Sequence, residues 1–382
     1  MLVGIDASRA VADRPTGTEI YSRRLIQALL TLDSPHRFRL YLRTAPPPHL
    51  FENVERRIIP FPSLWTHLRL SWEMARHQPD LLFVPAHVLP PIRPPLSLVT
   101  VHDLGYLKFP EAHPWRQRLY LDFSTRWNVR AATHVLADSR ATRADLVAHY
   151  GTQPDKISVA YPGVDRALGP IRDPAVIRAA KDRYGIGGDY FLYLGTLQPR
   201  KNLRRLVDAF TAFAGRGSGV ATPALVLAGK RGWLYEELFD QVRRRELQDR
   251  IIFPGYVAAE DKAALLSGAL AFTFPSLHEG FGLPVLEAQA CGCPVITSTT
   301  SSLPEVAGDA ALLVAPQDTA AIADAMERLA ADSTLSQELI QRGFANLKRF
   351  SWQACAQTVL NVIAQISNPG TPPHHTPLAS DP

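Results

Sequence analysis

The feature that most constrains this chain is a regular alternation of short apolar segments with longer helical ones. The first series predicts strands at 2–6, 37–42, 57–60, 81–84, 96–101 and 133–137, with helices at about 18–32 and 64–76. Alternating strands and helices favour a parallel sheet with crossover connections. The first 165 residues therefore predict one Rossmann-like domain.

A second alternating series follows. It predicts strands at 190–194, 224–227, 251–253, 270–274 and 294–297, with helices at 202–213, 234–245, 261–268 and a further one that ends at 291. Between the two series, residues 161–188 carry eight prolines and glycines, which is typical of a connection. We therefore predict an α/β fold with two doubly wound Rossmann-like domains, 1–165 and 189–350, joined by a linker at 166–188. Their strand carboxyl ends are expected to face a central cleft.

The composition is that of a globular protein, with 46% apolar and 20% charged residues among 382. No apolar run has the length of a membrane span, and Met1 leads directly into a strand, so a cytoplasmic location is expected. The net charge of +5 arises in residues 1–165, which hold 20 Lys and Arg against 15 Asp and Glu, whereas the remainder holds 21 of each. This predicts a local basic surface. No RNA-binding motif accompanies it, so nucleic acid is not an expected partner.

No metal site is expected from the cysteines. Cys291 and Cys293 have no companion His or Cys pair at metal-ligand spacing, which favours small buried residues.

A strand, a loop and a helix start follow one another near the string HEGFGLPVLE (278–287). Unpaired N–H groups and the positive end of the dipole make a helix start suitable for a phosphate. Gly280 and Gly282 allow a ligand to approach the backbone closely. Glu279 and Glu287 could accept hydrogen bonds from hydroxyls, so the pattern favours a nucleotide sugar. Alternatively, Glu279 caps the helix and Glu287 lies in solvent.

The longer string SLHEGFGLPVLEAQACGCPVITS (276–298) resembles the donor-sugar motif of the retaining GT-B glycosyltransferases of family 4. The resemblance implies that Glu279 lies at the donor sugar and that Glu287 binds the ribose hydroxyls. It also implies that the amides of Phe281 and Gly282 meet the sugar or the diphosphate. The donor-binding residues expected in this loop are Glu279, Gly280, Phe281, Gly282, Leu283 and Glu287.

A second motif, GTLQPRKN (195–202), follows the first strand of the second series. Arg200 offers a planar bidentate fork and Lys201 a compact charge, so the two can neutralise a diphosphate. Cations are disfavoured at a helix start, which favours an anionic ligand over a solvated role. The string resembles the G-T-x-x-P-R-K-N signature of the same family. This implies that Arg200 and Lys201 hold the donor phosphates, and Gly195 joins the expected donor site.

In the first domain, His102 and Asp103 end a predicted strand, where a histidine is often only hydrogen bonded within the fold. The string VTVHDLGYLKFPEAHP (99–114) resembles a region of bacterial mannosyltransferase-like members of the family. The resemblance implies that His102 lines the catalytic cleft and contacts the donor sugar, while Asp103 orients the loop. Ser139, after the strand at 133–137, could cap the next helix or contact the donor or the acceptor.

Two weaker signals add to the expected donor site. Gly17, in the loop RPTGTE (14–19) after the first strand, is placed where a phosphate could approach, although many relatives carry two glycines there. The absence of G-x-G-x-x-G argues against a nicotinamide enzyme. Tyr256 and Val257 follow Gly255 and resemble the family's nucleobase-contacting turn.

The segment 113–130 interleaves aromatic side chains with arginines. They are Trp115, Tyr120, Phe123 and Trp127 with Arg116, Arg118, Arg126 and Arg130. Such a helix usually packs its aromatic face on its own domain. The alternative is peripheral docking at the inner face of the membrane, where a polyprenyl-linked acceptor would lie.

The resemblance extends to about residue 366 and implies a retaining glycosyltransferase with the GT-B fold. It would move a hexosyl unit, mannose-like or glucose-like, from a nucleoside diphosphate sugar to a glycan or a lipid-linked glycan. The catalytic groups implied are His102, Glu279, Arg200 and Lys201, and a donor phosphate oxygen would receive the acceptor proton. No metal cofactor is expected, because Arg200 and Lys201 supply the positive charge.

Two alternatives remain open at this level: a nucleotide-sugar 2-epimerase-like isomerase, and a non-catalytic protein that binds sugar nucleotides or glycans. The resemblance further implies that a helix at 351–366 packs back on the first domain. Residues 367–382, rich in proline, predict a disordered tail.

Overall fold

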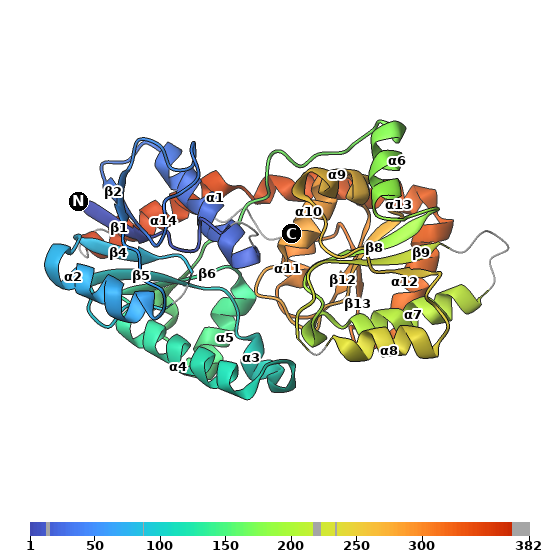
Figure 1. Ribbon diagram of the computed structural model, residues 1–382, viewed down its shortest axis with the longest axis horizontal. Coiled ribbons are helices and arrows are strands. Elements are labelled where there is room, and N and C mark those ends of the chain that lie inside the picture. The colour runs from blue at the N-terminus through green and yellow to red at the C-terminus, as the bar shows by residue number, and fades with distance from the viewer. Residues whose placement is uncertain (13–15, 87, 217–222, 234, 369–382) are drawn as a thin grey trace. The chain divides into compact units, whose positions relative to one another are not determined.

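The computed structural model describes residues 1–12, 16–86, 88–216, 223–233 and 235–368 (Figure 1). The chain divides into two compact units. Unit 1 comprises Met1–Leu107, His113–Gly163 and the residues from Arg349 onward, and unit 2 comprises Lys108–Ala112 and Val164–Lys348. Each unit contains one parallel sheet flanked by helices, as the alternating pattern predicts.

The sheet of unit 1 has its strands in the order β3-β2-β1-β4-β5-β6-β7. These are β1 (Leu2–Asp6), β2 (Arg37–Leu42), β3 (Glu55–Ile58), β4 (Leu81–Val84), β5 (Leu96–Val101), β6 (His134–Ala137) and β7 (Ile157–Val159). Strand β1 pairs with both β2 and β4, so the order of the sheet reverses there. Ligands of doubly wound folds bind outside the strand carboxyl ends at this point. The pattern did not reveal β7, which has only three residues.

Helices cover this sheet, and Figure 1 shows α1 on one side of it and α4 and α5 on the other. The helices of unit 1 are α1 (Gly17–Thr31), the π-helix η1 (Trp65–Leu70), α2 (Ser71–His77), α4 (Trp115–Ala131), α5 (Arg140–Tyr150) and α14 (Trp352–Ser367), and α3 (Gly105–Lys108) lies at the unit boundary. Helix α14 packs against α1 and β5. A Cβ added at Gly163 would lie 2.2 Å from the backbone nitrogen of Trp352, so the chain passes the start of α14 too closely for a side chain.

The sheet of unit 2 has the order β10-β9-β8-β11-β12-β13. Its strands are β8 (Tyr190–Leu194), β9 (Ala224–Ala228), β10 (Ile251–Ile252), β11 (Ala271–Phe274), β12 (Val295–Ser298) and β13 (Leu312–Val314). Its helices are α6 (Pro174–Arg183), α7 (Leu203–Gly215), α8 (Glu236–Arg244), α9 (Ala259–Ser267), α10 (Leu283–Ala290), α11 (Leu303–Ala307), α12 (Thr319–Ala331) and α13 (Ser333–Asn346). Strand β8 lies between β9 and β11, which is the switch point of this sheet.

The span 166–188, expected as a linker, contains a helix. Helix α6 packs on α9 within unit 2. Asp173 caps its start by accepting a hydrogen bond from the Ala175 amide at 2.8 Å, and Pro174 occupies its first turn. Gly185, with φ +69°, follows its end. Proline at the start and glycine after the end are typical of a helix, so these residues mark its limits.

Some expectations fall on residues outside those described: Arg14 and Pro15 of the glycine loop, Leu234 at the expected start of a helix, and 369–382 of the tail. Among the helices that the structure does describe, none is both long and apolar enough to cross a bilayer.

Candidate active site

Three of the expected residues meet in unit 2. Lys201 Nζ lies 2.5 Å from Glu279 Oε1, and Arg200 Nη1 lies 3.1 Å from Glu279 Oε2. The side chains are 9% to 11% exposed, so water screens these charges only weakly. Burial alone would raise the pKa of Glu279, but the adjacent Arg200 and Lys201 outweigh burial and lower it. The carboxylate is therefore held ionised between two cations.

The two cations come from the connection between β8 and α7. A 3-10 turn, η4 (Pro199–Lys201), follows β8, and Asn202 then takes a left-handed conformation (φ 61°) before α7 begins. The side-chain amide of Asn202 donates to the carbonyls of Pro275 (3.0 Å) and Pro316 (2.6 Å). These bonds anchor the turn to the segments that follow β11 and β13. Arg200 and Lys201 thus precede α7 and lie at the carboxyl end of the switch-point strand.

The loop that carries Glu279 is also fixed by hydrogen bonds. The Glu279 amide donates to Ser301 Oγ at 2.9 Å, and Ser302 Oγ donates to the carbonyls of Glu279 (2.9 Å) and Phe281 (2.6 Å). Arg200 also donates to the carbonyl of His278. Lys201 Nζ stands 4.8 Å above the ring of Phe274, a favourable cation–π distance. The cluster is therefore held in place before any ligand binds.

Helix α10 starts directly after this loop, at Leu283, as the strand–loop–helix pattern predicts. Gly282 has φ +115°, and a Cβ there would lie 2.9 Å from Leu303 Cδ2, so glycine is required. Gly280 has no positive φ, so its freedom is not used in this conformation. Phe281 is buried.

Glu287 lies on α10 and is paired with a residue that the sequence motifs did not indicate. Lys262 Nζ, on α9, lies 2.8 Å from Glu287 Oε1. Burial would lower the pKa of Lys262, but the Glu287 carboxylate outweighs burial and raises it. A lysine and a glutamate at this separation in the sequence do not form a recognisable motif. Only the tertiary structure, which brings the two side chains together, reveals the pair.

The other expected donor residues of unit 2 lie in nearby turns. A Cβ at Gly195 would lie 2.7 Å from Tyr193 Oη, so the backbone after β8 accommodates only glycine. Gly255 has φ +80° and accepts a hydrogen bond from the Gly229 amide at 2.7 Å. Tyr256 is exposed and Val257 is buried.

In unit 1, His102 is bonded through both ring nitrogens. Nδ1 lies 2.6 Å from Asp138 Oδ2, and Nε2 lies 3.0 Å from the carbonyl oxygen of Pro85. Both partners are acceptors, so the ring must carry both protons to form both bonds. Burial opposes that charge, but the Asp138 carboxylate outweighs burial and raises the pKa of His102. Asp138 is a positioning partner that the sequence did not single out, since 36 residues separate it from His102.

The remaining expected residues of unit 1 have local roles. Ser139 Oγ accepts a hydrogen bond from the Thr142 amide at 3.0 Å and caps α5, which is one of the two roles expected for it. Asp103 Oδ1 accepts from the Gly105 amide at 2.8 Å and so shapes its loop. Gly17 is the first residue of α1, and an added Cβ would meet no atom within 4 Å, so the fold does not require glycine there.

Comparisons with known proteins agree with this arrangement. Residues 15–168 match the family described as Glycosyltransferase Family 4, and residues 178–345 match the one described as Glycosyl transferases group 1. The O-antigen chain mannosyltransferase B of Escherichia coli is 33% identical over 294 residues, which is 77% of this chain and 76% of that protein. The chain therefore belongs to the family 4 glycosyltransferases, and it is a glycosyltransferase enzyme.

Among individual relatives, the O-antigen chain mannosyltransferase RfbU of Salmonella typhimurium strain LT2 is 27% identical over 67% of this chain and 66% of its own. Sucrose-phosphate synthase from Thermosynechococcus elongatus has a similar structure, with a TM-score of 0.75 at 21% identity, covering 97% of this chain and all of that one. Anabaena HepE in complex with UDP and glucose gives a TM-score of 0.73 at 19% identity, over 95% of this chain and 99% of its own. These structures confirm the predicted fold class, two Rossmann-like α/β domains of the GT-B type.

Proposed function

We propose that this glycosyltransferase transfers a hexosyl unit, with retention of configuration, from a nucleoside diphosphate sugar to a hydroxyl of a glycan acceptor. The observation that carries the proposal is the cluster of Arg200, Lys201 and Glu279 in unit 2. It follows the carboxyl ends of β8 and β11, which are neighbours at the switch point of the sheet. That is where doubly wound folds bind nucleotide ligands.

The cluster supports a role for Arg200 and Lys201 in binding the donor diphosphate. Glu279 pairs with both cations, but its single negative charge balances only one of them. A diphosphate carries more negative charge than one carboxylate, so it can share or take over these partners. The two cations would then stabilise the charge that the leaving group gains as its bond to the sugar breaks. Because they supply positive charge at that position, we propose that the enzyme works without a metal ion.

The same cluster makes Glu279 a poor covalent nucleophile, because a carboxylate paired with two cations has a lowered pKa. We therefore propose direct transfer on the face of the leaving group. The acceptor oxygen forms its bond to the anomeric carbon as the bond to the donor phosphate oxygen breaks, and that phosphate oxygen takes the acceptor proton. Glu279 would contact the sugar once the diphosphate occupies Arg200 and Lys201, and Glu287 would contact the ribose.

The names of the relatives support mannose as the sugar and a polysaccharide as the product. Both O-antigen enzymes cited above are mannosyltransferases by name. We propose a mannose-like hexose, a glycan or polyprenyl-linked acceptor, and peripheral contact with a membrane through unit 1. His102 would lie near the donor sugar, where its protonated form, stabilised by Asp138, would place a positive charge.

The test is to incubate the purified protein with a panel of nucleoside diphosphate hexoses, with and without glycan acceptors, and to determine the anomeric configuration of the product by NMR. We expect transfer with the configuration of the donor sugar. Release of an isomerised sugar without an acceptor would identify an isomerase, binding without turnover would identify a binding protein, and an inverted product would refute the proposed mechanism.

A further inference from the structure

The start of helix α9 is held by a residue from another helix. Its N-cap residue is Ala258, whose methyl side chain cannot accept a hydrogen bond. The Ala258 amide donates to Tyr184 Oη at 3.0 Å, and Tyr184 Oη donates to Asp261 Oδ2 at 2.8 Å. Asp261 is the third residue of α9, where the acidic member of a capping box stands. The hydroxyl of Tyr184, at the end of α6, therefore lies between two groups that a capping box joins directly.

Arg183 adds a charge to this arrangement by forming an ion pair with Asp261. Burial would raise the pKa of Asp261, but the hydrogen bonds from Arg183 and Tyr184 outweigh burial and lower it. The carboxylate is therefore ionised at neutral pH, which strengthens the hydrogen bond that it accepts from the Tyr184 hydroxyl. A negative charge in the first turn of α9 also suits the positive end of the helix dipole.

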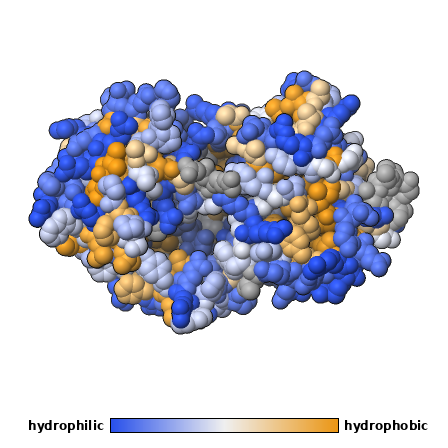
Figure 2. Space-filling view, viewed as in Figure 1, coloured by the Kyte–Doolittle hydropathy of each residue, from blue (hydrophilic) through white to orange (hydrophobic). Residues whose placement is uncertain are grey.

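Helix α6 makes two separate contacts with α9, which lies next to it in Figure 1. Ala180 is buried, but most other residues of α6 are exposed, and Figure 2 shows hydrophobic and hydrophilic side chains intermixed at this surface. An apolar contact lies at the far end of α9, where a Cβ added at Gly268 would be 2.5 Å from Ile177 Cγ2. The polar contact of Tyr184 is at the start of α9, so its loss should leave the apolar contact in place.

The turn before α9 is the one in which a nucleobase contact is expected, and it is fixed at both ends. At its beginning, the Gly255 carbonyl accepts a backbone hydrogen bond at 2.7 Å. At its end, the Ala258 amide donates to Tyr184. Tyr256 and Val257 lie between these two anchors. Without the Tyr184 hydroxyl, the turn would keep only the first of them.

The first turn of α9 also holds Glu287, the residue proposed above to contact the ribose. Lys262 follows Asp261 directly, and its Nζ lies 2.8 Å from Glu287 Oε1. A shift in the start of α9 would therefore move Lys262 and change the position of the Glu287 carboxylate. Both expected contacts to the nucleoside thus depend on the same helix start.

We propose that Tyr184 is a positioning residue for the nucleoside half of the donor site. Its hydroxyl joins the Ala258 amide to the Asp261 carboxylate and so fixes the start of α9 and the turn before it. The inference rests on the proposed function, since it requires a nucleotide donor. The diphosphate half of the site depends on other contacts, because Asn202 anchors the turn that carries its two cations.

The test is calorimetric titration of the wild type and Tyr184→Phe with UDP, GDP and ADP, and with inorganic pyrophosphate as the diphosphate alone. We expect Tyr184→Phe to weaken binding of the nucleotide that the wild type binds best about fivefold, the effect of one ordinary hydrogen bond. Pyrophosphate affinity should not change. KM for the corresponding donor should rise by a similar factor at unchanged kcat, because the lost contact stabilises ground state and transition state equally.

Tyr190→Phe is the matched control in unit 2. The Tyr190 hydroxyl donates to the Leu265 carbonyl at 2.7 Å, so this variant removes one hydroxyl contact near the other end of the same helix. It should lower the melting temperature but leave both affinities unchanged. In addition, Tyr184→Phe should cost little further nucleotide affinity in an Asp261→Ala background, because both residues act through one chain of hydrogen bonds.

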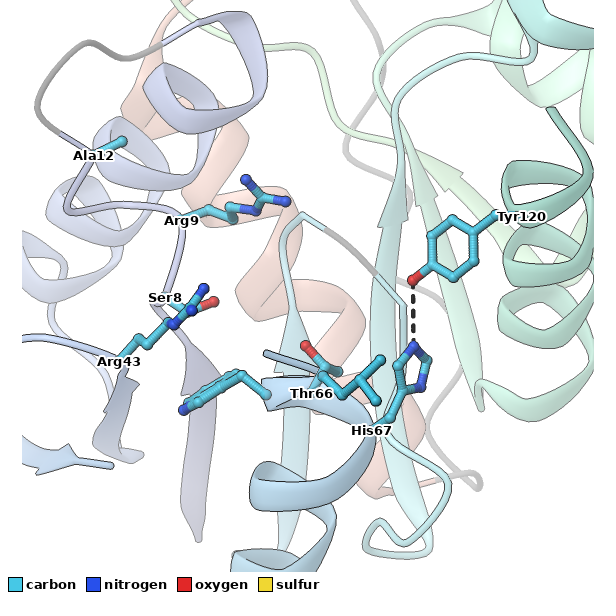
Figure 3. A pocket seen from close by; sticks show the side chains of 9 residues that line it. Ser8, Arg9, Ala12, Arg43, Thr66, His67 and Tyr120 are labelled. Carbon is cyan, nitrogen blue, oxygen red and sulfur yellow. Dashed lines mark hydrogen bonds between the residues drawn. The ribbon is translucent and has the colours of Figure 1, made fainter. Parts of the chain in front are cut away.

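A second control lies in unit 1. Tyr120 Oη lies 3.3 Å from His67 Nε2 in a pocket of about 350 Å³ between the loops after β1 and β2, η1 and α4 (Figure 3). Tyr120→Phe makes the same chemical change outside the unit that holds the donor site. It should leave the affinities for the nucleotide and for pyrophosphate unchanged.

Three results would overturn the inference: wild-type nucleotide affinity in Tyr184→Phe, an equal loss of affinity for pyrophosphate, or a nucleotide effect of the same size in Tyr190→Phe. In each of them the wild type still binds nucleotide. A wild type that binds none of the three nucleotides would instead refute the proposed function together with the inference, so the two failures are distinguishable.

Discussion

Replacing Glu279 with glutamine removes the negative charge that holds Arg200 and Lys201 in the ligand-free protein. The substitution keeps the size of the side chain but removes the carboxylate that pairs with these two cations, each 11% exposed. Removing one partner of a buried ion pair costs about 3 to 5 kcal/mol. Arg200 keeps its bond to the His278 carbonyl, and Lys201 keeps the face of Phe274, so we expect the lower end, about 3 kcal/mol.

For a unit of this size, such a loss lowers the melting temperature by roughly 6 to 12 °C. Calorimetric melting of the ligand-free variant measures it. Nucleoside diphosphate should stabilise Glu279→Gln at least as much as the wild type, because it supplies the missing negative charge to the same cations. Turnover of the full donor should nevertheless fall, since the proposed contact of Glu279 with the sugar is lost.

A double-mutant cycle with Lys201→Met isolates the pair. The two substitutions together should cost at least about 1 kcal/mol less than the sum of the single ones, because each single variant breaks the same Lys201–Glu279 pair and leaves its other charged member buried. The reasoning is refuted if Glu279→Gln melts within about 2 °C of the wild type, if the cycle is additive, or if the variant no longer binds nucleotide.

Four further outcomes follow from the same cluster and its surroundings. Arg200→Ala and Lys201→Ala should each lower donor turnover about 100- to 1000-fold, the usual effect of losing one preorganised contact; wild-type rates would contradict the diphosphate role. Glu287→Gln should weaken nucleoside diphosphate affinity about tenfold in calorimetry, because an amide forms weaker bonds to ribose hydroxyls than a carboxylate. Transfer should persist in excess chelator, and a loss restored by Mg²⁺ would show a metal requirement. The folded pKa of Glu279 lies below its ordinary value of 4.5, so its stabilising effect is present above that pH and is lost as the pH falls through the folded value. The melting temperature of the wild type should therefore fall more steeply below pH 4.5 than that of Glu279→Gln, and parallel curves would argue against the ion cluster.

Local sequence patterns were sufficient for many of the strands and for the positions in the chain of the proposed site residues, but not for β7 or α6. The apolar runs at β1, β4, β5 and β8 coincide with the predicted strands, because a strand buried on both faces must be largely apolar along its length. The turn at Gly282 and the start of α10 were also predictable from the sequence, since each depends on only a few adjacent residues. The span 166–188 was ambiguous because proline and glycine end helices as readily as they form connections.

The partners of those groups were decided only by the tertiary structure. Lys201 and Glu279 are 78 residues apart, and they meet because β8 and β11 are neighbours although β9 and β10 intervene in the chain. His102 meets Asp138 because β5 and β6 pair, and Glu287 on α10 meets Lys262 on α9 although β11 lies between these helices in the chain. The pocket of unit 1 likewise combines loops after β1 and β2 with η1 and α4. A hydrophobic period records which face of an element is buried, but not which element lies against it. The charges that balance one another in this protein are therefore set by strand order, which no local pattern encodes.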